Sequence, residues 1–409
     1  METERSSDTR IGRALRELSA LAPDEERVFC RAVELELAEG LGRDREPAGE
    51  VGVEADEAVR LLYDGLLDGG KRVRSRLLWR AWQACSRSHG PDVPSSVLKV
   101  AAGLELVQAC AVVHDDIMDG SSRRRSAPTL HLAVADEHRI RGWTGDSERY
   151  GVSMAILAGD LALARADDLV AEAVCDDRAV ESALRRTWRR MRMDMVAGQV
   201  LELRLQAQQS GSSEQALAVA SLKSGGYSVQ RPLELGADLA GATADQRWTL
   251  SGFGRKVGLA FQLADDLRDL FGTEAELGKE PGSDVVEGKR TYLVLRAMES
   301  AAEQGMRREE DVIRTALLSR DSSGLDVRRV QEAVERIGTD REVRDLVGRL
   351  RDEAFTLLDE GQRFGSEARR RLTDLAQRLT TTGPYGQDGG VPGRRAPALR
   401  RRFEDGDLR

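Results

Sequence analysis

The feature that most restricts the fold is a helical repeat of apolar residues that runs along almost the whole chain. One predicted helix face carries Val100, Leu104, Val107, Ala111 and Asp115, at steps of three and four residues. A second predicted face has the same spacing at Leu259, Leu263, Asp266 and Leu270. Because about 3.6 residues make one turn, side chains spaced in this way share one face of an α-helix. The sequence has no strand–helix alternation, so it predicts an all-α protein.

The composition agrees with a helical fold and predicts how the chain is divided. Aromatic residues make up 4% of the 409 residues, and Ala, Leu, Arg and Glu dominate, which favours helices over sheets. Segments of helix length predict about ten or more helices in a single large helical bundle domain, residues 11–381. Residues 1–10 are polar, and residues 382–409 are rich in Gly, Pro and Arg. Both ends have little to bury and are predicted to be disordered.

Charge and cysteine usage restrict the partners and the location. A net charge of -8 argues against nucleic-acid binding, which needs a broad basic surface. The apolar stretch 97–113 is interrupted by Lys99 and Glu105, so it predicts a buried helix and not a membrane span. The N-terminus has no apolar segment like that of a signal peptide. The scattered cysteines are typical of a reduced, cytoplasmic protein; they are Cys30, Cys85, Cys110 and Cys175.

Two clusters of aspartates share one spacing, and each closes an apolar helix. The first cluster is Asp115, Asp116 and Asp119; the second is Asp265, Asp266 and Asp269. On a helix, the first and last members of each cluster lie one turn apart on the same face. Three carboxylates this close repel one another unless a cation lies between them, and Mg²⁺ prefers oxygen ligands. Two clusters on facing helices would hold several such ions across one cavity.

A solvated acidic surface is the alternative interpretation, since most runs of charge are exposed. The identical spacing of the two clusters argues against it, because a solvated surface has no need of a repeated pattern. An EF-hand does not fit either. Counted from Asp115, its third and twelfth positions would be Ile117 and Ser126, and neither residue is a suitable ligand.

Basic residues accompany both clusters. They are Lys71 and Arg74 on a Gly-rich approach, Arg124 and Arg125 after the first cluster, and Lys223, Lys279 and Lys289 around the second. Arg makes forked contacts to phosphate and Lys supplies a point charge. Any one of them alone is more typical of a solvated surface. Together they fit two polyphosphate groups, one held through metal and one held directly.

The motifs of this chain and their order along it resemble those of a known family. The chain is similar to the trans-isoprenyl diphosphate synthases of the polyprenyl synthetase family over residues 60–300, and more loosely to residue 378. The matching motifs occur in the family's order: GGKRVR (69–74), HDDIMD (114–119), RR (124–125), GD (159–160), GQ (198–199), KSGGYSVQRP (223–232), FQLADD (261–266) and GKEPGSDVVEGKRT (278–291). The resemblance implies the isoprenoid synthase fold, a helical bundle around a central apolar cavity.

The resemblance also implies a role for each matching residue. All six aspartates would bind Mg²⁺, with three ions in each active site. The allylic diphosphate would be held by Arg124, Lys223, Lys279 and Lys289. Isopentenyl diphosphate would be held by Lys71, Arg74, Gln108 and Arg125. Ser224 and Gln262 would line the reacting centre. Two departures from the family pattern, Ser75 in place of Pro and Ser126 in place of Gly, remove no ligand.

The implied reaction is a Mg²⁺-dependent condensation of isopentenyl diphosphate with dimethylallyl, geranyl or farnesyl diphosphate. Ionisation of the allylic C–O bond leaves a cation and a charged leaving group, which metal and basic side chains stabilise. A class I terpene cyclase and a non-catalytic partner subunit are the alternatives of the same fold. Cyclases keep one aspartate motif and such subunits lose aspartates, whereas this chain keeps both clusters. The family further implies a homodimer.

The residues below Asp115 predict the product length. Successive turns of this helix carry Ala111, Val107 and Leu104, with Cys110 beside Ala111. Each turn advances about 5.4 Å, comparable to one isoprene unit. Family members that stop at fifteen carbons often carry bulky aromatics at the two positions that Cys110 and Ala111 occupy. These small side chains predict a twenty-carbon product, geranylgeranyl diphosphate; farnesyl and longer polyprenyl products are the alternatives. The small residues could instead accommodate a packed helix.

Overall fold

The computed structural model describes residues 25–52, 59, 70–86, 93–124, 127–173, 177–277, 280–319 and 324–381. Within these residues the chain is almost entirely helical, so the predicted all-α fold class is confirmed. The β-structure in the described part is a hairpin of two-residue strands, β1 (Arg123–Arg124) and β2 (Ala127–Pro128), paired antiparallel. The predicted disordered ends, residues 1–10 and 382–409, lie outside the described residues.

Both halves of the chain combine long and short helices. The first half contains α2 (Glu25–Val51), α4 (Val73–Cys85), α5 (Ser95–Met118), α6 (Leu130–Ile140), α7 (Ser147–Glu172) and α8 (Arg178–Gln208). The second half contains α9 (Ser213–Val219), the π-helix η2 (Ala220–Gln230), α10 (Arg231–Leu239), α11 (Ala244–Phe271), α12 (Glu274–Leu277), α13 (Ser283–Val286), α14 (Tyr292–Gln304), α15 (Arg307–Leu318), α16 (Gly324–Ile337), α17 (Thr339–Asp359), the short 3-10 helix η3 (Glu360–Gln362) and α18 (Ser366–Leu379).

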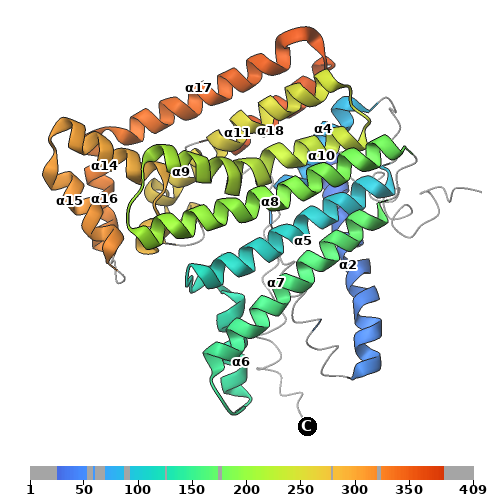
Figure 1. Ribbon diagram of the computed structural model, residues 1–409, viewed down its shortest axis with the longest axis horizontal. Coiled ribbons are helices and arrows are strands. Elements are labelled where there is room, and N and C mark those ends of the chain that lie inside the picture. Colours follow the sequence, from blue (N-terminus) through green and yellow to red (C-terminus); the bar gives the residue numbers. More distant parts are fainter. Residues whose placement is uncertain are drawn as a thin grey trace, which may run out of the picture.

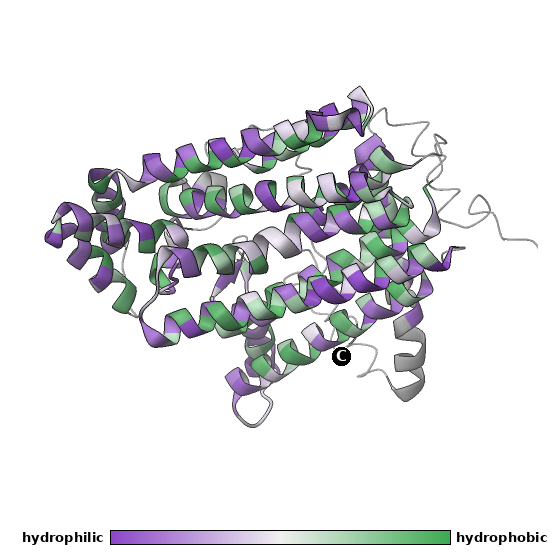
Figure 2. Cartoon of the chain, turned by 45° about the horizontal axis from the view of Figure 1, so that its top comes forward, coloured by the Kyte–Doolittle hydropathy of each residue, from purple (hydrophilic) through white to green (hydrophobic). Residues whose placement is uncertain are grey.

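The long helices pack side by side. α5 packs along α7, η2 packs along α11, and α11 packs along α17. Figure 1 shows α14, α15 and α16 together at one end of this bundle, and α6 projecting beside α7. Hydrophilic and hydrophobic residues alternate around the long helices (Figure 2), as expected where one side of a helix covers a core.

Helix α5 is the centre of one core. Val100, Leu104 and Val107 are fully buried, and they pack with Leu78 of α4 and Trp188 of α8. α5 is long and apolar enough to cross a membrane by composition, but 72% of its apolar window is buried inside the structure. A helix that contacts protein on nearly all sides needs apolar residues all round. This is the buried helix that the sequence predicts over 97–113.

Candidate active site

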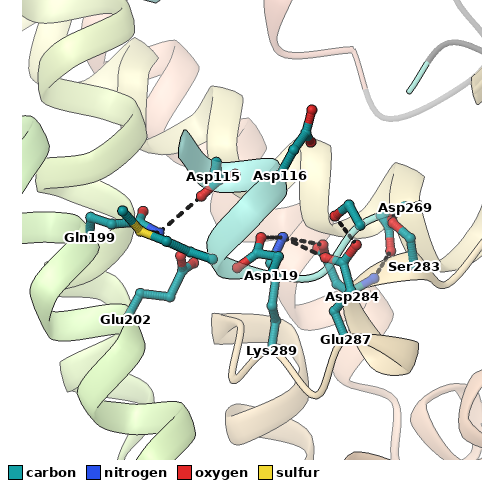
Figure 3. A network of polar contacts seen from close by, with 12 residues as sticks. Asp115, Asp116, Asp119, Gln199, Glu202, Asp269, Ser283, Asp284, Glu287 and Lys289 are labelled. Atoms are coloured by element: carbon teal, nitrogen blue, oxygen red, sulfur yellow. Dashed lines mark hydrogen bonds and ion pairs between the residues drawn. The ribbon is translucent and has the colours of Figure 1, made fainter. Parts of the chain in front are cut away.

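The first aspartate cluster lies where α5 ends. Asp115 is in the last turn of the helix and Asp119 is its C-cap. Gly120 follows with a φ of 67°, a left-handed conformation that Gly adopts without a steric penalty and that stops a helix. Asp115 and Asp119 are one turn apart, so their carboxylates lie on the same side of the helix end (Figure 3).

Asp115 is contacted by side chains from two other helices. Its Oδ1 accepts hydrogen bonds from Gln199 Nε2 of α8, at 3.0 Å, and from Lys223 Nζ of η2, at 2.9 Å. Lys223 also forms an ion pair with Glu202, one turn beyond Gln199 on α8. The pKa of Asp115 is lowered, because the Lys223 and Lys289 ammonium groups and the hydrogen bond from Lys223 outweigh the cost of burial.

The π-helix η2 gives Lys223 its position. A Cβ atom on Gly198 of α8 would lie 2.5 Å from the backbone N of Lys223, so only glycine allows this approach. A Cβ on Gly225 would lie 2.9 Å from the carbonyl carbon of Gly258 on α11. Short π-helical segments are frequent at functional sites because the wider turn redirects side chains. Here the two close approaches fix η2 between α8 and α11 and place Lys223 beside the first cluster.

Asp115, Asp119 and Glu202 form a group of carboxylates that can share one cation. Each offers an oxygen within 4.8 Å of the oxygens of the other two. Asp119 Oδ1 is buried and has no hydrogen-bond partner in the described residues. Burial raises the pKa of Asp119 to about 6 even though Lys289 contacts its other oxygen. A buried carboxylate oxygen without a partner is costly, and a divalent cation with oxygen ligands would satisfy it. The residues present therefore fit Mg²⁺.

Asp116 points away from this group (Figure 3). Its carboxylate is 5% exposed and accepts forked hydrogen bonds from Arg124, from Nε at 2.8 Å and from Nη2 at 2.6 Å. Burial raises the pKa of Asp116, and the Arg124 hydrogen bonds oppose that rise. The sequence assigns Asp116 to metal and Arg124 to a diphosphate; here the two are bound to each other.

The second cluster, at the end of α11, holds its three aspartates in three different ways. Asp265 is 60% exposed and accepts a hydrogen bond from Arg268 at 3.0 Å. Asp266 is buried, and its Oδ1 accepts from Gln262 Nε2 at 2.7 Å. Burial, together with nearby acidic groups, raises the pKa of Asp266 well above its usual value. Asp269 is buried and belongs to the loop contacts described next.

Asp269 anchors the segment that leads to Lys289. Its carboxylate accepts from Ser283 Oγ at 2.7 Å and from the backbone N of Asp284 at 3.0 Å. Gly282, at φ 79°, donates its backbone N–H to the Asp269 carbonyl at 2.6 Å. Val327 is so close that a Cβ at Gly282 would lie 2.3 Å from its side chain. The segment is therefore held firmly against α11.

Lys289 links the two clusters. Its Nζ lies 2.7 Å from Asp119 Oδ2, 2.7 Å from Glu287 Oε2 and 3.6 Å from Asp284 Oδ1. These acidic groups raise the pKa of Lys289 well above its usual value, against the effect of burial. Figure 3 shows this chain of contacts from Asp119 across to Asp269. The two aspartate clusters, far apart in sequence, thus face one another across a single charged site.

A second polar group lies deeper, around Tyr227 of η2. The Arg74 guanidinium lies over the Tyr227 ring, 4.4 Å from its centroid, and donates to Ser228 Oγ at 2.6 Å. The Tyr227 hydroxyl donates to Gln108 Oε1 at 2.8 Å. The sequence assigns Arg74 and Gln108 to the same substrate, and in the structure both contact Tyr227, Arg74 over the ring and Gln108 at the hydroxyl group. Lys71 is exposed on the approach to α4.

The approach to Arg74 is held by a buried carboxylate. Glu105 of α5 is 8% exposed and accepts from Ser75 Oγ at 2.6 Å and from Arg72 Nη1 at 3.2 Å. Arg72 has a left-handed backbone, at φ 48°. Ser75, where the family commonly has proline, therefore makes a hydrogen bond that proline could not make.

The remaining predicted site residues are placed as follows. Arg125 and Lys279 lie outside the described residues. Ser224 follows Lys223 on η2 and is partly buried. On α5, Leu104 and Val107 are fully buried, Cys110 is 3% exposed and Ala111 is partly exposed. Burial raises the pKa of the Cys110 thiol to about 11, so at neutral pH it is a neutral, small apolar group.

Sequence reasoning did not assign Glu202, Tyr227 or Glu287 to the site. Glu202 lies one turn after the GQ motif on α8, and helical spacing from Gln199 was the signal that could have found it. Tyr227 is within the KSGGYSVQRP motif, but a π-helix does not follow the 3.6-residue period. Glu287 reaches Lys289 through a tight turn that no periodicity indicates.

The GD motif has a steric reason. A Cβ atom on Gly159 of α7 would lie 2.1 Å from His114 Nε2. The same nitrogen lies 3.3 Å from the Ile156 carbonyl oxygen, and the Cys110 thiol lies 3.7 Å from His114 Nδ1. Gly159 thus makes room for the histidine that precedes the first cluster, and His114 fixes α5 against α7.

An all-α bundle that brings carboxylates and basic side chains to one charged site is the arrangement expected of an isoprenoid synthase type of enzyme. The family model for polyprenyl synthetase matches residues 56–334. The chain therefore belongs to the polyprenyl synthetase family, and the family predicted from the sequence motifs is confirmed. It is a trans-prenyltransferase.

Curated relatives and solved structures agree with this family. The chain is 30% identical over 248 residues to a short chain isoprenyl diphosphate synthase of Methanocaldococcus jannaschii, covering 61% of this chain and 68% of the relative. It is 34% identical over 254 residues to a nonaprenyl diphosphate synthase of Mycobacterium tuberculosis, covering 60% of this chain and 66% of the relative. The crystal structure of geranylgeranyl pyrophosphate synthase from Corynebacterium glutamicum, complexed with isoprenyl diphosphate and magnesium, superimposes with a TM-score of 0.82. It is 35% identical, covering 87% of this chain and 99% of the other.

Proposed function

We propose that this protein condenses isopentenyl diphosphate with an allylic diphosphate and releases geranylgeranyl diphosphate. The observation that carries the proposal is a group of charged side chains at the C-terminal end of the buried apolar helix α5. The group consists of Asp115, Asp119 and Glu202, with Lys223 and Lys289 beside them. Charge collects at the end of α5, and apolar side chains line the helix below it. An elongating prenyltransferase needs this combination, because its substrate has a charged head and a growing apolar tail.

Mg²⁺ is the ion that these carboxylates suit. Asp115, Asp119 and Glu202 would hold metal from one side and Asp265 from the other, in keeping with three ions per site. Bound metal supplies electrostatic stabilisation of the charge that develops on the leaving diphosphate. Asp266 and Asp269 are also predicted ligands. In the structure Asp266 accepts a hydrogen bond from Gln262, and Asp269 accepts one from Ser283. These contacts keep α11 and the Lys289 segment in place, and metal binding by Asp266 and Asp269 remains part of the proposal.

The basic side chains divide between the two substrates. Lys223 and Lys289 lie against the first cluster and would contact the allylic diphosphate, together with Arg124 and Lys279. Arg74 and Gln108 lie around Tyr227, outside the carboxylate group, and would hold isopentenyl diphosphate with Lys71 and Arg125. The buried apolar wall of α5 would exclude water from the allylic cation, and Ser224 and Gln262 would border the reacting carbons.

The side chains along α5 support the proposed product length. Cys110 and Ala111 are small, and the next larger side chains below them, Val107 and Leu104, are fully buried. A tail of fifteen carbons would pass the level of Ala111 and stop a turn or two lower. Relatives with short-chain, geranylgeranyl and nonaprenyl products are all similar to this chain, so family membership alone leaves the length open.

A homodimer and a cytoplasmic location complete the proposal. Ile156 and Leu157 of α7 and Met193, Val196 and Val200 of α8 are exposed apolar residues. Exposed apolar side chains of this kind are typical of a subunit interface. The free cysteines Cys30, Cys85 and Cys110 agree with a reducing compartment.

The test is product analysis with each allylic starter, isopentenyl diphosphate and Mg²⁺. Geranylgeranyl diphosphate is the expected product from dimethylallyl, geranyl and farnesyl diphosphate. Ala111→Phe is expected to shorten the product towards fifteen carbons, because the ring would occupy the level that the growing tail must pass. An unchanged product from a folded, active Ala111→Phe variant would contradict the claim that side chains along α5 limit the product length. Failure to consume isopentenyl diphosphate would contradict the function itself.

A further inference from the structure

Arg74 differs from the neighbouring arginines of its segment in the partners of its side chain. Arg72 forms an ion pair with Glu105. Arg76 forms an ion pair with Glu26. Arg74 is partly buried, and within the described residues it forms no ion pair. Its Nε is buried and has no hydrogen-bond partner there. A buried cationic group without an acidic partner is costly, and an anionic ligand would compensate this cost.

Two neutral groups of η2 hold the Arg74 side chain. The guanidinium carbon lies 4.4 Å from the centroid of the Tyr227 ring, and Nη2 donates to Ser228 Oγ at 2.6 Å. Tyr227 is 3% exposed and Ser228 is 4% exposed, so both groups are fixed by the surrounding core. An aromatic ring and a hydroxyl group orient a guanidinium without cancelling its charge.

The π-helix η2 places Ser228 one turn beyond Lys223. The two residues are five positions apart, which is the interval that one π-helical hydrogen bond spans. Lys223 contacts Asp115 in the first aspartate cluster. Ser228 therefore ties Arg74 to the same short helix that positions Lys223 beside the carboxylates.

We infer that Ser228 is a positioning residue for isopentenyl diphosphate: it orients the Arg74 guanidinium and leaves the charge available to diphosphate oxygens. The inference rests on the proposed function, which assigns Arg74 to that substrate. A guanidinium binds phosphate through forked hydrogen bonds, so the orientation of its plane decides how well it binds. An acidic side chain in place of Ser228 would hold Arg74 equally well but would neutralise it. A role limited to joining α4 to η2 would affect stability and not the affinity for one substrate.

The test is the steady-state kinetics of Ser228→Ala with saturating Mg²⁺ and farnesyl diphosphate as the allylic substrate. The KM for isopentenyl diphosphate should rise by at least about tenfold, because loss of a hydrogen bond to a charged group weakens binding by this factor or more. The kcat and the KM for farnesyl diphosphate should each change by less than about twofold, since the contact supports the binding of one substrate.

Three further variants separate positioning from packing. Ser228→Thr keeps the hydroxyl and should keep the KM for isopentenyl diphosphate within about threefold of wild type. Ser228→Cys has nearly the same volume but a weak acceptor, so it should raise this KM without a cavity. Ser251→Ala of α11 is the matched control, because Ser251 also makes a 2.6 Å hydrogen bond to a charged side chain, that of Glu234. It should lose stability in thermal unfolding and keep both KM values.

A double-mutant cycle shows whether Ser228 acts through Arg74. R74Q should raise the KM for isopentenyl diphosphate, and R74Q/S228A should exceed R74Q by no more than about twofold, because the contact is already lost. The same tenfold effect of Ser228→Ala in both backgrounds would overturn the inference. A wild-type KM in Ser228→Ala beside a raised KM in R74Q would overturn the inference and leave the proposed function intact. A wild-type KM in R74Q would overturn both the inference and the assignment of Arg74 to isopentenyl diphosphate.

Discussion

The two aspartate clusters have the same spacing in sequence and opposite environments in the fold. In the first, Asp115 and Asp119 share a space with Glu202, and one buried oxygen of Asp119 has no partner in the described residues. In the second, Asp266 and Asp269 are buried and hydrogen-bonded by Gln262, Ser283 and the Asp284 backbone, while Asp265 is exposed.

The difference lies in the partners of the carboxylates: an oxygen of Asp119 in the first cluster has none in the described residues, whereas Asp266 and Asp269 in the second accept hydrogen bonds from neighbouring groups. Asp269 fixes the segment that carries Lys289 back to Asp119. The second cluster therefore acts on the first through the protein as well as through any shared metal. Carboxylate spacing alone does not distinguish a ligand from an anchor.

The largest effect on activity is expected at the first cluster. Asp115→Asn removes a charge that neutralises metal, so kcat should fall by at least about a hundredfold, with the helical circular dichroism spectrum unchanged. Steady-state turnover with saturating Mg²⁺ measures it. Asp168→Asn, an exposed carboxylate on α7, is the matched control and should keep full activity. Full activity of Asp115→Asn would contradict the proposal that the first cluster binds the metal needed for catalysis.

Glu202→Gln tests whether Glu202 binds metal together with Asp115 and Asp119. Glu202 lies within ligand distance of both aspartates and also pairs with Lys223. Neutralising it should raise the Mg²⁺ concentration for half-maximal activity by about ten- to a hundredfold, the range found when groups that support metal ligands are lost. Glu214→Gln, exposed on α9, is the control. An unchanged Mg²⁺ requirement would mean that Glu202 serves only to hold Lys223.

Asp269→Ala tests the anchoring role of the second cluster. The variant loses the acceptor for Ser283 Oγ and for the Asp284 backbone N–H, which should cost about 2–4 kcal/mol of unfolding free energy. Chemical denaturation in chelator measures this without metal. Asp265→Ala removes an exposed carboxylate of the same cluster and should cost no more than about 0.5 kcal/mol. Equal losses would erase the distinction between the two residues.

The smallest effect is a pH dependence at Asp119. Its pKa is raised from 3.8 to about 6 by burial, so the folded protein binds a proton that the unfolded chain has released between these values. The stability of the metal-free protein should therefore fall as pH rises from about 4 to about 6. Asp119→Asn removes this penalty, and at pH 8 in chelator it should be more stable than wild type by about 1–3 kcal/mol.

Thermal or chemical unfolding at two pH values checks this prediction. Near pH 4, where the wild-type Asp119 is protonated, the two proteins should be equally stable. Added Mg²⁺ at pH 8 should stabilise the wild type more than Asp119→Asn, because metal binds the ionised carboxylate. A variant that is less stable than wild type at pH 8 in chelator would show that the Lys289 ion pair outweighs burial.

Much of the fold could be predicted because its signals are local. The 3.6-residue period of α5 and α11 is a property of the chain itself, and it located both helices and their buried faces. The aspartate spacing placed Asp115 and Asp119 on one side of a helix end for the same reason. Glu202 was not found because its place in the site depends on α8 lying beside the end of α5, two segments that are far apart in the sequence. The contact of Gly198 with Lys223 brings η2 against α8 and so places Lys223 beside both Glu202 and Asp115, and this contact has no local signature.

The sequence by itself determined which helices form, which faces are apolar and which residues carry charge, because these depend on neighbours a few positions away. Only the tertiary structure decided what each charge does. It turned Asp116 towards Arg124 and away from Asp115, and it committed Asp269 to a loop. It also used a π-helix to bring Lys223 against Asp115. The physical reason is that burial and the distance to an opposite charge fix the state of a carboxylate, and both are set by packing between segments far apart in the chain.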